Sequence, residues 1–368
     1  MPDDLLADNK KLLTSFGADS IDKLKSLPDF YTFNKGLIYS HRDFDKFYSS
    51  LKRGEKCAIV SGFNASGNMH LGHLGVFDTN MYFQREHGLK VFIPISDDES
   101  YVSLKVKTQE EAMKNALTLV RTMIGMGFDP GKTHIIIDYL YTDIYNLAIK
   151  LSRGVTMSEI RAVYGYTHDQ NAGLHFYPAV QAAHVTLPQT MGIPNVLVPI
   201  GPDEDAHLRV CRDMADKFGY NKPAVLHSRF FPGTDGNKMS KSRNNAIFFL
   251  EDEKSIKKKV MAAFSGGQTS VEEHRRLGGN PDVDVAFLYL KSYFLSEKES
   301  DKIGEEYRSG KLLSGELKQM LFEKLMKRVG EFRKRYDKVT PRDIEKILLK
   351  NEDVDVQSII ERMGIFKD

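Results

Sequence analysis

Short apolar runs alternate with amphipathic segments between residues 56 and 250. Residues 70–81 place four large apolar side chains on one helical face, and residues 108–126 have a second helical pattern. Strands that alternate with helices predict an α/β fold, in which a Rossmann-type, largely parallel sheet has helices on both faces. The apolar runs that have the length of buried strands are 57–60, 91–95, 134–138, 196–200 and 224–226.

The chain differs on either side of this α/β pattern. Residues 1–52 are predicted to form an N-terminal extension, with a β-hairpin over 30–40 and a helix over 44–51. After residue 250 no further strand of the parallel sheet is predicted, and helical periodicity dominates. The sequence therefore predicts a Rossmann-type domain over 53–250 and a C-terminal all-α domain over 251–368. The helices expected in the latter cover 256–264, 283–295, 317–336 and 343–349.

Four loops follow the carboxyl ends of predicted strands, where open parallel sheets bind their ligands. They hold a glycine and histidine motif, an acidic run, a Gly-Pro-Asp-Glu turn and a lysine-rich segment. Because these strand ends meet at one edge of a sheet, we expect the four loops to form one site. The loops cover residues 61–73, 96–101, 201–207 and 231–244.

The composition is that of a globular enzyme of about two domains, with 368 residues, 41% hydrophobic content and a net charge of +2. This near-neutral balance excludes a polybasic nucleic-acid binder, so any such binding needs a local patch. Residues 311–350 hold 12 Lys or Arg against 6 Asp or Glu, whereas residues 251–310 hold 10 against 12. Four basic residues of the first segment are candidates for contacts with a nucleic-acid backbone, although each also fits a solvated helix face. They are Arg328, Arg333, Lys334 and Arg335.

The cysteines and the N-terminus bear on the compartment. Cys57 and Cys211 lie too far apart for a local Cys-x-x-Cys metal or redox motif, and a reducing compartment fits best. Residues 1–12 carry several charges and no long apolar run, so neither a signal peptide nor a transmembrane helix is predicted. We expect a cytoplasmic protein without a membrane partner.

A pair of lysines stands in the last of the four loops. Lys238 and Lys241 are three residues apart, and the glycines and aspartate that precede them favour a mobile loop. Met239, Ser240 and Ser242 complete the run. Two mobile ammonium groups suit a chain of phosphates. Taken alone, the run also fits a solvated basic loop.

A pair of histidines stands in the first loop. His70 and His73 share a face at the start of a predicted helix, where the N–H groups of the first turn point the same way. An anion there would meet two imidazoles and the positive end of the helix dipole, and Gly72 allows its close approach. The alternatives are a structural histidine pair or a metal site, but no carboxylate or cysteine accompanies the histidines at ligand spacing.

A strand, a glycine loop and a His-x-Gly-His helix start, followed much later by Lys-Met-Ser-Lys-Ser, resemble the two signatures of class I aminoacyl-tRNA synthetases. From about residue 30 to 320 the chain resembles the archaeal and eukaryotic type of tryptophanyl-tRNA synthetase. The stretches that carry this resemblance are 36–43, 96–99, 176–183, 226–232, 264–267 and 278–280.

The resemblance implies that the first motif holds the α-phosphate of ATP and that the second, together with Mg²⁺, neutralises the β- and γ-phosphates. ATP and Mg²⁺ would enter as substrate, with no tightly bound cofactor. The catalytic residues implied are His70, His73, Lys238 and Lys241. The ATP-binding residues implied are Gly62, Gly72, Asp203, Met239, Ser240 and Ser242.

The resemblance also implies an amino-acid pocket. Glu99 would accept the indole N–H of tryptophan and Gln181 would contact the amino group, although a solvated acidic loop and a packing amide are plainer interpretations. Three positions depart from the family's pattern: Val60 occupies the position of a tyrosine, and Pro94 and Glu204 occupy positions of glutamines. Glu204 could still hold the ammonium group, because a carboxylate is a stronger partner for a cation than an amide is.

As a whole, the resemblance implies ATP-dependent attachment of tryptophan to tRNA(Trp) through tryptophanyl-adenylate. It further implies that residues 251–368 bind the anticodon arm, and that a homodimer forms through an inserted region at about 108–195. Two alternatives remain open. The first is a tyrosyl-tRNA synthetase of the same architecture, in which the aspartate that hydrogen-bonds to the phenol of tyrosine stands at the position of His184 here. The second is a non-catalytic, synthetase-like protein that binds tRNA. Such a protein would be free to lose the four residues that are implied to bind the phosphates, but all four are present here.

Overall fold

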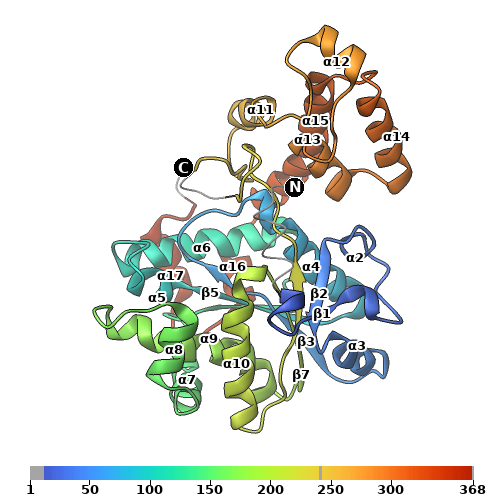
Figure 1. Ribbon diagram of the computed structural model, residues 1–368. Helices are drawn as coiled ribbons and strands as arrows, with labels where there is room; N and C mark the ends of the chain where they lie inside the picture. The colour runs from blue at the N-terminus through green and yellow to red at the C-terminus, as the bar shows by residue number, and fades with distance from the viewer. Residues whose placement is uncertain (1–11, 240–242, 367–368) are drawn as a thin grey trace.

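The computed structural model describes residues 12–239 and 243–366, and its centre is a single β-sheet (Figure 1). In the described part of the chain this sheet has nine strands, in the order β1-β2-β8-β7-β3-β5-β6-β9, with β4 paired to β5. The strands are β1 (Asp19–Ser20), β2 (Ile38–Arg42), β3 (Cys57–Val60), β4 (Phe63–Asn64), β5 (Lys90–Ser96), β6 (Thr133–Ile137), β7 (Asn195–Ile200), β8 (Ala224–Ser228) and β9 (Leu348–Leu349).

The five predicted strands form the parallel centre of this sheet, which confirms the Rossmann-type fold. β3, β5, β6, β7 and β8 all pair in parallel with their neighbours among these five. β3 lies between β5 and β7, so the order of the strands along the chain reverses there. Parallel sheets bind ligands at such a reversal, outside the carboxyl ends of the strands.

Both faces of the sheet are buried, because successive side chains of a strand point to opposite faces. In β3, Ile59 belongs to a core that includes α4 and α6, whereas Val60 belongs to a core formed with α7, α9 and α10. The same alternation in β5 places Pro94 on the face of Val60. The helices on this second face are α7 (Ile144–Ser152), α8 (Met157–Tyr164), α9 (Ala172–Thr190) and α10 (Asp205–Lys217).

Two predicted helices border the ligand edge of the sheet, and both are confirmed. The pattern at 108–126 is α6 (Gln109–Met126), whose N-cap Thr108 accepts a hydrogen bond from the Glu111 amide at 3.1 Å. The pattern at 70–81 begins with a 3₁₀ turn, η2 (Leu71–His73), and continues as α4 (Leu74–His87). Within the residues that the structure describes, no helix combines the length and apolar character needed to cross a membrane.

The N-terminal segment joins the sheet rather than extending from it. β2 pairs antiparallel with both β1 and β8, and α3 (Phe44–Lys52) forms as predicted. The predicted hairpin over 30–40 is wrong, because α2 (Tyr31–Asn34) and β2 occupy this stretch. The alternation of bulky residues arises instead from a short helix that buries Phe33 and a strand that buries Ile38.

The helical domain stands beyond the ligand edge of the sheet in Figure 1, and the chain then returns to the sheet. After α15 (Ser314–Tyr336), α16 (Pro341–Ile347) and α17 (Val356–Met363) pack against α6. The prediction that no sheet strand follows residue 250 is wrong, because β9 pairs in parallel with the edge strand β6. The other helical elements are α11 (Glu253–Met261), α12 (Val271–Leu277), α13 (Val285–Tyr289), the π-helical η4 (Leu290–Phe294) and α14 (Glu297–Arg308).

Candidate active site

Two cavities lie side by side at the carboxyl ends of β3, β5 and β7. We call the first the histidine cavity, because His70 and His73 line it, and the second the glutamate cavity, because Glu99 and Glu204 line it. Their volumes are about 370 and 300 Å³. The residues that line both are Gly62, Phe63, Asn64, Ile200 and Glu204. The four predicted loops therefore contribute to one continuous site.

The two predicted histidines form a compact pair on the wall of the histidine cavity. His70 is the N-cap of η2, and its Nδ1 accepts a hydrogen bond from the Gly72 amide at 3.2 Å. The Nδ1 of His73 in turn accepts from the His70 amide at 3.2 Å, and the two imidazole centroids are 3.8 Å apart. A Cβ atom on Gly72 would meet His70 Nδ1 at 3.0 Å and Met239 Sδ at 3.2 Å, so a side chain here would crowd both motifs.

Lys238 reaches the same cavity from the opposite loop. Its Nζ lies 3.3 Å from Oδ2 of Asp203 and 4.0 Å from the ring centroid of Phe230. The side chain of Asn245 donates to the Lys238 carbonyl oxygen at 3.1 Å and to Asp235 Oδ1 at 2.8 Å, which fixes the base of the loop. The sequence had assigned no role in the site to Asn245 or Phe230. The predicted residues Ser240, Lys241 and Ser242 lie outside the described residues.

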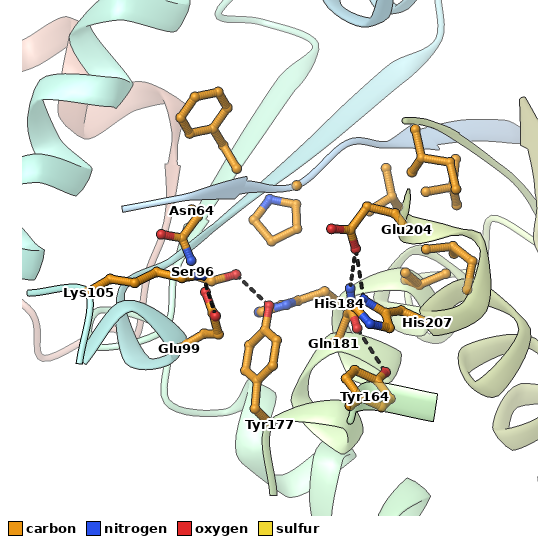
Figure 2. Close-up of a pocket in the computed structure, with 18 of the residues that line it drawn as sticks. Asn64, Ser96, Glu99, Lys105, Tyr164, Tyr177, Gln181, His184, Glu204 and His207 are labelled. Carbon is orange, nitrogen blue, oxygen red and sulfur yellow. Dashed lines mark hydrogen bonds and ion pairs between the residues drawn. The ribbon is translucent and has the colours of Figure 1, made fainter. Parts of the chain in front are cut away.

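A closed ring of contacts forms one end of the glutamate cavity (Figure 2). The Tyr164 hydroxyl donates to Gln181 Oε1 at 3.0 Å, and Gln181 Nε2 donates to Glu204 Oε2 at 3.5 Å. The same Glu204 oxygen lies 3.1 Å from His207 Nδ1, and the His207 ring stacks on Tyr164 with their centroids 4.1 Å apart. Burial alone would raise the pKa of Glu204, but the hydrogen bonds from His207 and Gln181 hold this pKa below its ordinary value. The sequence had predicted Gln181 and Glu204 but not Tyr164 or His207.

The other predicted pocket residues lie around this ring. Glu99 stands in the first turn of α5 (Asp97–Val102) and forms an ion pair with Lys105. Val60 and Pro94 line the cavity from the sheet. Gly62 borders both cavities. The predicted amino-acid residues thus surround one space, whose floor is apolar and whose two ends carry carboxylates.

Three carboxyl groups lie behind the glutamate cavity, those of Asp97 and Asp138 buried and that of Asp98 half-buried, and oxygens of all three fall within 4.8 Å of one another. Asp97 Oδ1 accepts from the Asp138 amide at 2.8 Å, and Asp138 Oδ1 lies 2.6 Å from Nε2 of His184. Burial raises the pKa of Asp97 to about 7, also raises the pKa values of Asp98 and Asp138, and lowers the pKa of His184 to about 4. Oxygens at this spacing are within reach of a single metal ion.

Asp97→Asn is expected to change how stability depends on pH. A pKa raised from 3.8 to about 7 means that the folded state keeps a proton that the unfolded state has lost. The stability due to this group therefore falls as pH rises from about 4 to 7, by up to about 1.4 kcal/mol per pH unit. Urea unfolding of both proteins across this range should show the wild-type advantage shrinking with pH. Parallel curves would contradict the shift, and Asp301→Asn, at an exposed position of α14, is the control.

The predicted tRNA-binding arginines of α15 are occupied within the chain. Arg328 forms an ion pair with Asp78 of α4 at 2.5 Å. Arg335 Nε donates to the Gly125 carbonyl oxygen at 2.7 Å, and Arg333 donates to the carbonyl oxygen of Glu251. Through Arg328 and Arg335, α15 contacts α4 and the end of α6 in the sheet domain, whereas Arg333 binds within the helical domain. Lys334 is exposed.

Comparison with known proteins gives consistent matches over most of the chain. The family model of class I tRNA synthetases (W and Y) matches residues 52–330. The chain is 42% identical over 332 residues to tryptophan–tRNA ligase 2 of Halobacterium salinarum, covering 88% of this chain and 85% of that protein. It is 34% identical over 367 residues to the cytoplasmic tryptophan–tRNA ligase of Saccharomyces cerevisiae, covering 94% and 85%.

A solved structure agrees in fold. Tryptophanyl-tRNA synthetase from Aeropyrum pernix superposes with a TM-score of 0.86 at 31% sequence identity, covering 94% of this chain and 98% of that one. The agreement therefore includes the helical domain as well as the sheet. The sequence resemblance and the two-cavity site are consistent with these matches.

Proposed function

The chain belongs to the class I tRNA synthetases for tryptophan and tyrosine, and we propose that it attaches tryptophan to tRNA(Trp) at the expense of ATP, through tryptophanyl-adenylate. The relatives described above are named for this reaction. The observation that carries the proposal is the shared wall of the two cavities, where Gly62 and Glu204 border both. An amino acid in one cavity can thus present its carboxylate to a phosphate in the other.

The histidine cavity would carry out the transfer of the adenylyl group. A carboxylate oxygen of tryptophan attacks the α-phosphorus of ATP, the bond from this phosphorus to the bridging oxygen of the β-phosphate breaks, and pyrophosphate leaves. Charge accumulates on the phosphoryl oxygens and on pyrophosphate, so positioned donors and cations accelerate the step. His70 and His73 would stabilise the transferred group, and Lys238 and Lys241 would hold the pyrophosphate. In the second step a ribose hydroxyl of the terminal adenosine of tRNA attacks the acyl carbon, and AMP leaves.

ATP enters this scheme as its Mg²⁺ complex. Mg²⁺ is usually bound by substrate phosphates together with one or two carboxylates. Asp203 is a half-exposed carboxylate on the wall of the histidine cavity, 3.3 Å from Lys238. This position suits either the metal or the ribose of ATP, and it keeps Lys238 beside the phosphates.

The glutamate cavity would bind tryptophan between its two carboxylates. Glu204, held ionised by Gln181 and His207, lies on the wall shared with the histidine cavity, where the ammonium group of the substrate must sit. Glu99 lies at the other end and would accept the indole N–H. Val60 and Pro94 form the apolar floor between them. Glu204 would thus take the place of the glutamine expected from the family's pattern.

Glu204→Ala should raise the KM for tryptophan about 10- to 100-fold, since a hydrogen bond to a charged group contributes about 1.5–3 kcal/mol. The KM for ATP should change little. Pyrophosphate exchange at varied tryptophan and, separately, at varied ATP concentration measures the two constants. Glu204→Gln is the matched control and should retain much of the affinity, because its amide oxygen can still accept from the ammonium. Equal KM values for the alanine variant and the wild type would exclude this role.

Partners and location complete the proposal. The helical domain would bind the anticodon arm, with Lys334 among the exposed basic groups of α15.

A homodimer would form through the inserted region, because Ile149 and Met157 there are 63% and 52% exposed. Sedimentation velocity tests the dimer, and salt dependence of tRNA binding tests the phosphate contacts. Location in the cytoplasm is proposed by analogy with the yeast relative.

Amino-acid-dependent pyrophosphate exchange tests the central proposal. Exchange with tryptophan is expected. Exchange with tyrosine alone would favour the sister activity, and no exchange with any amino acid would favour a non-catalytic tRNA-binding protein. His184 supports tryptophan as the substrate. This buried histidine contacts Asp138 and lines the cavity at the position where a tyrosine enzyme would have the aspartate that binds the phenol, so an imidazole stands there and not a carboxylate.

A further inference from the structure

Lys105 is the one lysine or arginine among the described residues that line the glutamate cavity. Its Nζ lies 2.8 Å from Oε1 of Glu99. Figure 2 shows this pair at one end of the cavity, with Glu204 and His207 at the other end. The ion pair therefore occupies the end at which the proposed function places the aromatic ring of the substrate.

The backbone before Lys105 has an unusual conformation that directs the lysine toward Glu99. Leu104 has a φ of 61°, in the left-handed region where a helix end usually has glycine, and its side chain is 83% exposed. The amides of Lys105 and Val106 both donate to the carbonyl oxygen of Ser100, at 3.0 and 3.2 Å, and Val106 is buried. The strained turn therefore reverses the chain after α5 and brings Lys105 back over the cavity.

The ion pair leaves Glu99 with one carboxylate oxygen for a ligand. Oε1 is bound by the Lys105 ammonium, and no residue in the described ranges donates a hydrogen bond to Oε2. The Glu99 side chain is only 13% exposed, and that of Lys105 is 47% exposed at the rim. A substrate ring that covers Glu99 would remove its remaining water, which disfavours an ionised carboxylate unless a cation stays beside it. Lys105 provides that cation while its own ammonium remains partly hydrated.

We propose that Lys105 is a positioning residue for amino-acid selection, which holds Glu99 as a charged acceptor of fixed orientation for a ring N–H. It thereby sets the preference for an indole over a ring of the same shape that has no N–H donor. This inference rests on the proposed function, because it takes Glu99 as the acceptor for the indole. Lys105 acts through Glu99 and does not touch the reacting atoms.

The test compares tryptophan with 3-(3-benzothienyl)alanine, in which sulfur replaces the indole N–H, in pyrophosphate exchange. The wild type should prefer tryptophan about 100-fold in kcat/KM, because an unpaired charged acceptor strongly disfavours the analogue. Lys105→Met keeps the length of the side chain and removes the ammonium group. It should lower the preference to about 10-fold, mainly through a higher KM for tryptophan, while the KM for ATP is unchanged. Lys105→Arg should restore most of the preference.

Two further variants separate positioning from a structural role. Lys107→Met is the matched control, because Lys107 is exposed and outside the cavity, and it should leave the preference unchanged. In a Glu99→Gln background, Lys105→Met should have no further effect on the preference. Unchanged preference in Lys105→Met, or an equal loss with both substrates, overturns the inference alone. If the wild type shows no pyrophosphate exchange in the presence of tryptophan, the proposed function and this inference are overturned together.

Discussion

Lys238→Ala is expected to lower the rate of adenylate formation by about 100- to 1000-fold, the loss that follows removal of one positioned donor from a developing charge. Tryptophan affinity should change little, because Lys238 borders the histidine cavity and not the glutamate cavity. The physical reason is that pyrophosphate gains its charge as the α-phosphorus bond breaks, so the ammonium group stabilises the transition state more than the bound substrates. Single-turnover formation of the adenylate and equilibrium binding of tryptophan measure the two quantities separately.

A matched lysine provides the control for this result. Lys222 also forms a half-exposed ion pair, with Asp216 at 3.2 Å, but it lies outside both cavities. Lys222→Ala should leave both measurements unchanged. Comparable losses of rate and of tryptophan affinity in Lys238→Ala would count against a role in holding pyrophosphate.

Asp78→Ala is expected to destabilise the protein by about 3–5 kcal/mol, the usual effect of removing one partner from a buried ion pair. Asp78 is 8% exposed on its side chain, accepts from Arg328 of the helical domain at 2.5 Å and also accepts from the Tyr31 hydroxyl. Its loss would leave the Tyr31 hydroxyl and the Arg328 guanidinium, on a side chain that is 27% exposed, without this acceptor. Because typical domains are stable by only about 5–15 kcal/mol, urea unfolding should show a large shift.

Two comparisons make this prediction specific. Asp282 forms an exposed pair with Arg308 at 3.4 Å, and Asp282→Ala should change stability by less than about 1 kcal/mol. The double variant Asp78→Leu with Arg328→Met should recover much of the stability, because no charge is then left buried. If Asp78→Ala behaved like Asp282→Ala, the pair would not fasten the helical domain to α4.

Helix α4 takes part both in the proposed adenylation site and in the packing of the helical domain. α4 begins directly after His73, which lines the histidine cavity, and one turn later presents Asp78 to Arg328. The helical domain is therefore attached to the same helix whose start would hold the α-phosphate. Replacement of Asp78 should accordingly be assayed for adenylation as well as for stability.

Local sequence patterns were sufficient for most of the sheet domain. The apolar run at 57–60 became β3, and Thr108 capped α6, because burial and capping depend on residues that are near one another in sequence. The pattern failed where pairing was long-range. β9 forms only because β6 has an unpaired edge, and β2 forms against β8, which lies far along the chain. Neither partner can be seen in a window of local sequence.

The sequence by itself determined the chemical components of the site: the histidine pair, Lys238, and the pocket residues Glu99, Gln181 and Glu204. It could do so because each motif places its groups within a few residues of one another, or follows a strand whose carboxyl end faces the site. Only the tertiary structure decided their partners. Tyr164 and His207 complete the ring around Glu204, and Lys105 pairs with Glu99 through a turn with no sequence signature.

The same distinction holds for the basic helix α15. Its charge was plain from the sequence, and it predicted contacts with RNA. The structure shows which groups these charges contact within the chain: the Arg328 guanidinium binds Asp78, and that of Arg335 binds the end of α6. Charge is a property of composition, but the partner of a charge depends on which surface packs against it, and that packing is set by the whole fold.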